Sequence, residues 1–168
     1  MDVALRDGDR AEGLVALHTP GHAADHLCFA SDDGVLFGAD HVMTWSSSVV
    51  RDMAAYFDSL RRVLARDDRW LLPGHGPPMP EPHGYMQRLS EHRRAREDAI
   101  VALLRREGAG TPGDARGGVT TEALTRTLYP DVDARLLRAA ERNVLAHLDK
   151  LAAEGRAVRD GEGWRGPR

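Results

Sequence analysis

The sequence predicts a mixed α/β fold, of the α+β kind, in two parts: a β-rich part over residues 1–80 and a helical part over residues 81–168. In the first part, short apolar runs end at Gly or Pro, as strands that lead into loops do. In the second part, apolar residues recur three and four positions apart, which is typical of helices. Charge follows the same division, with 7 basic and 12 acidic side chains in the first part and 16 and 14 in the second.

The first part is expected to hold a small sheet and one helix. An Asp-Gly turn at residues 31–34 separates two apolar runs, which predicts a β-hairpin. Five apolar residues have the spacing of one helix face: Met53, Tyr56, Phe57, Leu60 and Leu64. The expected strands cover 14–18, 26–30, 35–39 and 70–72, and the expected helix covers 52–65.

The second part is expected to be mostly helical. Helices are predicted over 84–107, from Thr120 or Thr121 to Leu128, and over 133–154, where Gly155 supplies the C-terminal cap. The Gly-rich stretch 108–118 predicts a connector. A small hairpin around residues 157–164 ends the chain, and this order of helices and hairpin is typical of a winged-helix module.

Composition excludes several classes of protein. No apolar run approaches the ~18 residues of a membrane-spanning helix, and the charged residues 1–10 do not form a signal peptide. Cys28 is the single cysteine, so an internal disulfide framework and a Cys-based zinc finger are both excluded. Neither part has the basic excess that announces nucleic-acid binding. We therefore expect a cytoplasmic protein that does not enter membranes.

Three residues have the character of metal ligands. His22 lies in His-Thr-Pro-Gly-His after one predicted strand, Asp40 ends another, and His75 lies in Pro-Gly-His-Gly after a third. Ligands in α/β architectures gather beyond the carboxyl ends of strands, where side chains can converge. Two imidazoles and a carboxylate suit Zn²⁺, with Mn²⁺ or Fe as alternatives.

The three motifs, separated by 18 and 35 residues, resemble successive signatures of the metallo-β-lactamase superfamily of hydrolases. The segments LSEHRRARE and NVLAHLDKLAAEGRA resemble the branch that contains the endoribonuclease beta-lactamase-like protein 2 and its bacterial relatives. The resemblance implies the C-terminal half of an αβ/βα sandwich followed by a winged-helix-like domain. It also implies a site with two zinc ions, in which His22 binds the first, Asp40 bridges both and His75 binds the second.

One departure from the family concerns the ligand set. The family's His-x-His-x-Asp-His motif supplies four further ligands upstream, together with the Asp that orients the attacking water, and the 168 residues do not contain it. We therefore expect a fragment or an N-terminally truncated chain with an incomplete, inactive site. A complete relative would hydrolyse an ester, thioester or phosphodiester, with a small molecule or RNA as substrate.

Two further histidines are candidates for supporting roles, and two other functions stay open. His26 is expected to anchor its loop, with support of a ligand as the alternative, and His41 follows Asp40 and is a candidate for the substrate pocket. The alternative functions are a winged-helix nucleic-acid-binding protein and a non-catalytic interaction protein. Loss of a facing sheet would also bare apolar side chains, so we expect a homo-oligomer.

Overall fold

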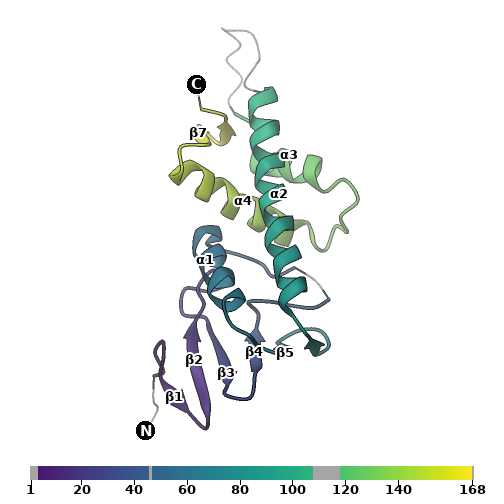
Figure 1. The fold of residues 1–168 in the computed structure, drawn as a ribbon. Coiled ribbons are helices and arrows are strands. Elements are labelled where there is room, and N and C mark those ends of the chain that lie inside the picture. The colour runs from purple at the N-terminus through teal and green to yellow at the C-terminus, as the bar shows by residue number, and fades with distance from the viewer. Residues whose placement is uncertain (1–3, 46, 108–117, 168) are drawn as a thin grey trace. The chain divides into compact units, whose positions relative to one another are not determined.

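The computed structural model describes residues 4–45, 47–107 and 118–167 (Figure 1). It divides the chain into two compact units, Met1–Glu91 and His92–Arg168. The strands of the first unit are β1 (Arg10–Ala11), β2 (Leu14–His18), β3 (Leu27–Ser31), β4 (Val35–Ala39), β5 (Trp70–Pro73) and β6 (Met79–Pro80). The helices are α1 (Met53–Leu64), α2 (His83–Glu107), α3 (Thr121–Leu128) and α4 (Leu137–Ala153), and β7 (Val158–Asp160) and β8 (Gly163–Arg165) end the chain.

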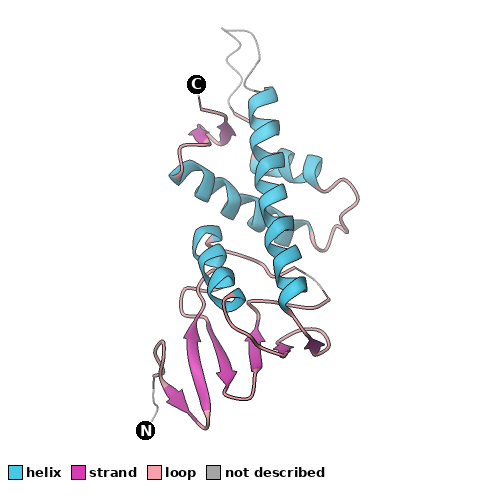
Figure 2. Ribbon diagram, viewed as in Figure 1, coloured by secondary structure: helices cyan, strands magenta, loops and turns pink. Residues whose placement is uncertain are grey.

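The first unit is built on one sheet with the strand order β1-β2-β3-β4-β5-β6 (Figure 2). Neighbouring strands are antiparallel except β4 and β5, which are parallel and are connected through α1. Because β2 and β4 are both antiparallel to β3, the strands β2, β4 and β5 run in one direction. Their carboxyl ends therefore lie at one edge of the sheet, which is the edge where the candidate ligands follow.

The sheet is apolar on both faces, but one face is more deeply buried than the other. Cys28, Leu36 and Leu71 are completely buried on one face, and α1 adds a buried stripe that includes Tyr56 and Leu60. The alternate positions of β3, β4 and β5 form a row across the other face, where Phe29 pairs with Phe37 and Phe37 with Leu72. In this row Phe37 is 39% exposed.

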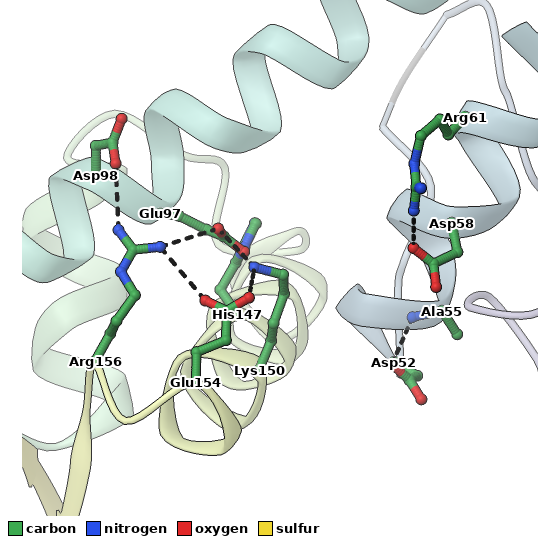
Figure 3. A network of polar contacts seen from close by, with 10 residues as sticks. All are labelled: Asp52, Ala55, Asp58, Arg61, Glu97, Asp98, His147, Lys150, Glu154 and Arg156. Atoms are coloured by element: carbon green, nitrogen blue, oxygen red, sulfur yellow. Dashed lines mark hydrogen bonds and ion pairs between the residues drawn. The ribbon is translucent and has the colours of Figure 1, made fainter.

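The expected helix over 52–65 is found as α1 with its N-terminal cap. Asp52 accepts a hydrogen bond from the backbone N of Ala55 at 2.9 Å, which satisfies one of the free N–H groups of the first turn (Figure 3). The expected strand over 26–30 is displaced by one residue, because the backbone N of His26 donates to the Ala23 carbonyl in a turn.

The second unit buries one core between its helices and the terminal hairpin. Of the two caps that the sequence predicts, Thr120 and Thr121, it is Thr120 that caps α3, by accepting from the backbone N of Ala123. The core comprises Ile100, Val101, Leu104, Leu124, Val144, Leu148, Leu151, Ala157 and Trp164. Deleting one of the larger of these side chains would cost about 2–5 kcal/mol.

The start predicted for the last helix, at residue 133, is wrong. The helix α4 begins at Leu137, because the Asp133 carboxylate binds the backbone N and the guanidinium of Arg135 and holds a turn there. The connector predicted over 108–118 lies, except for Gly118, outside the described residues. None of the helices in the described ranges is long and apolar enough to cross a bilayer.

Candidate metal centre

The structure brings His22, Asp40 and His75 together at the carboxyl edge of the sheet. The Nε2 atom of His22 lies 3.7 Å from Oδ2 of Asp40, and the Nε2 atom of His75 lies 3.6 Å from Oδ1 of the same carboxylate. Each oxygen of Asp40 thus faces a different imidazole. All three side chains are partly exposed, so the site is open to solvent.

Both separations are too long for hydrogen bonds but match two ligands on one ion. Ligands that each lie about 2.0–2.2 Å from a zinc ion at a tetrahedral angle are about 3.4 Å apart. Within the described residues, no group of three His, Cys, Asp or Glu side chains is arranged to hold a single ion. The arrangement is two His–Asp pairs that share one carboxylate, and each pair would need further ligands to complete a coordination shell.

The tautomer of His22 is set by its other ring nitrogen. Nδ1 lies 2.8 Å from the Val49 carbonyl oxygen, which can only accept a hydrogen bond, so Nδ1 carries the proton. In the neutral tautomer of the ring, the lone pair is therefore on Nε2, the nitrogen that faces Asp40. A backbone carbonyl on Nδ1 is the usual support of a metal-bound histidine, and the donor chemistry of this site therefore fits a metal ion.

Glycines allow the three loops to approach one another. A Cβ on Gly74 would lie 2.8 Å from Oδ1 of Asp40, so this position must be glycine for the His75 loop to reach the carboxylate. Gly74 also donates its N–H to the Ala39 carbonyl at 2.7 Å. Ala39 itself has a φ of 41°, an unusual conformation for a non-glycine residue, and it turns the chain from β4 into Asp40.

His26 and His41 continue from His22 as a series of neighbouring imidazole rings. His26 Nδ1 is 2.9 Å from the Thr19 hydroxyl oxygen, and its ring lies 6.0 Å, between centroids, from those of both His22 and His41. Burial, and next the nearby His22, lower the pKa of His26. His41 is completely buried, with its ring against that of Tyr56 at 4.9 Å. The supporting roles expected of both stay predictions.

A second cluster of charged side chains lies in the other unit, and no motif in the sequence indicates it. The Glu97 carboxylate on α2 is buried and accepts from His147 Nδ1 at 3.2 Å and from Lys150 Nζ at 3.0 Å (Figure 3). Arg156 lies 3.9 Å from the same carboxylate. Although burial raises the pKa of Glu97, the bonds from His147 and Lys150 outweigh it and the pKa is lowered. Burial also lowers the pKa of His147.

Comparison with known proteins identifies the C-terminal module and the class of fold. A family model described as the beta-lactamase associated winged helix domain matches residues 120–164. A solved metallo-beta-lactamase family protein from Thermus thermophilus superposes with a TM-score of 0.78 at 29% identity, over 98% of this chain and 53% of that chain. A beta-lactamase domain protein from Burkholderia ambifaria shares the fold with a TM-score of 0.81 at 23% identity, over 98% and 51%.

Curated relatives agree with this result. The chain is 31% identical over 140 residues to the beta-lactamase-like protein 2 homolog of Drosophila melanogaster, which is 83% of this chain and 46% of that protein. It is 32% identical over 148 residues to the lactamase-like protein aptB of Emericella nidulans, covering 86% and 48%. The resemblance to the C-terminal part of metallo-β-lactamase superfamily proteins, with a winged-helix domain, is confirmed. The chain spans about half the length of the curated relatives it matches.

Proposed function

We propose that this chain carries the C-terminal share of the active site of a metal-dependent hydrolase of the metallo-β-lactamase fold. The observation that supports it best is the position of Asp40, whose two carboxylate oxygens face two different imidazole nitrogens at 3.6 and 3.7 Å. A carboxylate with this placement suits the bridge between two metal ions. His22 and His75 would each bind one of the two ions.

The residues of the site are built to hold such ligands in place. The carbonyl of Val49 keeps the proton on Nδ1 of His22, so that Nε2 is free to coordinate. The absence of a side chain at Gly74 keeps His75 within reach of Asp40. When bound, metal ions of this kind lower the pKa of a coordinated water towards ~7 and polarise the substrate.

The proposed substrates are esters, thioesters or phosphodiesters, carried on a small molecule or on RNA. All three groups react through attack by water at a carbon or phosphorus centre that a metal can polarise. Zinc is the proposed metal, since imidazole and carboxylate ligands suit it. Each ion would have one histidine and the shared Asp40 as ligands, which is fewer than the three protein ligands that a catalytic zinc ion usually has. The 168-residue chain should therefore bind zinc weakly and turn over little substrate.

The test is metal binding to the 168-residue chain, measured by calorimetric titration with Zn²⁺ and Mn²⁺. Wild type should bind saturably, and Asp40→Ala should lower the affinity at least about tenfold, since the shared ligand is lost from both pairs. His83→Ala is the matched control, because His83 is an exposed histidine at the start of α2. Equal zinc affinity in wild type and Asp40→Ala would overturn the proposal.

A further inference from the structure

Trp45 is an exposed aromatic side chain on a backbone that is held at several points. It is 72% exposed, more than any other large apolar side chain of the described residues. Just before it, Thr44 donates its N–H to the His75 carbonyl at 3.3 Å and its hydroxyl to the Pro77 carbonyl at 2.8 Å. The hydroxyl of Tyr85 donates to the Met43 carbonyl at 2.6 Å.

These contacts place the backbone of Trp45 beside the loop that carries His75. A Cβ on Gly76 would lie 3.0 Å from the backbone N of Trp45, so the backbone of Trp45 directly abuts the residue that follows His75. The loop that carries Trp45 also begins at Asp40. The two loops that supply Asp40 and His75 are therefore bonded to each other, and Trp45 stands where they meet.

An exposed indole in such a place has the properties of a binding platform. Tryptophan presents a large, rigid apolar surface that loses only two side-chain torsions when a ligand orders it. The anchored backbone lowers the ordering cost further. A flat, exposed ring can bind another flat ring without a surrounding cavity, because the two ring faces can stack in parallel. A planar aromatic group is thus the ligand chemistry that this surface fits.

We propose that Trp45 is the platform on which an aromatic ring of the substrate stacks next to the metal centre. This inference rests on the proposed function and narrows its substrates to those in which an aryl group or a nucleobase adjoins the scissile bond. Trp45 would then be a specificity-determining residue, since it would contact the non-reacting part of the substrate.

The test compares ligands that share a phosphate and differ in their ring. Adenosine 5′-monophosphate carries a nucleobase, 1-naphthyl phosphate carries an aryl ring, and ribose 5-phosphate carries no aromatic ring. Binding to the full chain is measured by ligand-observed NMR, without added metal and with zinc. Variants are Trp45→Ala, Trp45→Phe and Trp70→Ala, the last a control at the start of β5, the opposite end of that strand from the His75 loop.

We expect Trp45→Ala to weaken binding of at least one aromatic ligand about tenfold or more, because stacking on an aromatic side chain contributes that much. Trp45→Phe should restore most of the affinity, and Trp70→Ala should leave it unchanged. The aromatic ligand that responds identifies the source of the ring. Any of three results would overturn the proposal. Neither aromatic ligand binds, Trp70→Ala weakens binding as much as Trp45→Ala does, or Trp45→Ala weakens the binding of ribose 5-phosphate to the same degree.

The assay separates this inference from the metal proposal. It needs neither metal nor turnover, so ring binding that depends on Trp45 would persist if zinc binding failed. Asp40→Ala provides the converse comparison, since it should lower zinc affinity and leave stacking on Trp45 intact.

Discussion

Replacing Gly21 with alanine should destabilise the N-terminal unit far more than a loop substitution normally does. A Cβ at this position would lie 2.6 Å from both Cα and Cβ of Tyr56 and 2.9 Å from its backbone N. Tyr56 is completely buried on α1 and its hydroxyl is bonded to the His41 carbonyl, so it cannot move aside. Gly21 also has a φ of 137°, which side chains rarely adopt.

The expected cost combines two effects. Overpacking of a closed core costs about 1–3 kcal/mol, and holding a non-glycine residue in a sparsely populated conformation costs about 1–3 kcal/mol. A loss of about 2–6 kcal/mol follows, against a total stability of about 5–15 kcal/mol for a typical domain. Urea denaturation, followed by circular dichroism, measures it.

Gly13→Ala is the matched control for this experiment. Gly13 has a φ of 80° and a Cβ there would meet no atom within 4 Å, so its substitution should cost only the conformational part. The difference between the two variants measures the contact with Tyr56. If Gly21→Ala is no more destabilising than Gly13→Ala, the close packing of this loop on α1 is refuted.

Three further outcomes are expected. The partly exposed apolar row around Phe37 should make the 168-residue chain bind a hydrophobic dye and self-associate, and Phe37→Ser should reduce both. A monodisperse wild-type monomer that binds no dye would contradict this. The stability of the C-terminal unit should fall on acidification, because the pKa values of His147 and Glu97 are both lowered in the folded protein. The contribution of His147 to stability declines as the pH drops below its ordinary pKa of 6.5, and that of Glu97 declines as the pH drops below 4.5. The protection factors of α4 amides, measured by hydrogen exchange and corrected for the intrinsic effect of pH on exchange, should therefore fall. His147→Gln should remove the part of this fall that begins near pH 6.5, and identical pH profiles of the two proteins would refute the assignment. Burial raises the pKa of Cys28 to about 11, so native protein at pH 8 should resist alkylation that proceeds in urea; equal rates in both conditions would contradict this.

The sequence was a good guide to elements with a strong local pattern. The helix α1 and the strand β4 begin and end within one residue of the expected positions, because apolar spacing and turn residues marked their ends. The start of α4 was missed, since helical spacing continues into residues 133–136. There the side chain of Asp133 competes for the backbone of Arg135, and a local hydrogen bond of this kind leaves no trace in periodicity.

The supports of the candidate site were harder to predict than its three principal residues. Motifs and strand ends indicated His22, Asp40 and His75, and the structure brings these together. The carbonyl that bonds His22 belongs to Val49, 27 residues further along the chain, and only the tertiary fold brings these two residues together. A signal did exist for Gly74, which precedes His75 in a Pro-Gly-His-Gly run, but only the approach to Asp40 explains it.

The Glu97 cluster carried a signal that apolar periodicity hides. His147 lies on the same stripe as Val144 and Leu151, and Glu97 on the same stripe as Ile100 and Leu104, so both polar side chains occupy positions that face the core. A polar residue at a core position needs a partner, because an unpaired buried charge is costly. Two such residues of complementary chemistry on separate helices are therefore each other's best available partners. If the polar residues that interrupt apolar stripes are considered as possible partners of one another, the contact between Glu97 on α2 and His147 on α4 can be predicted.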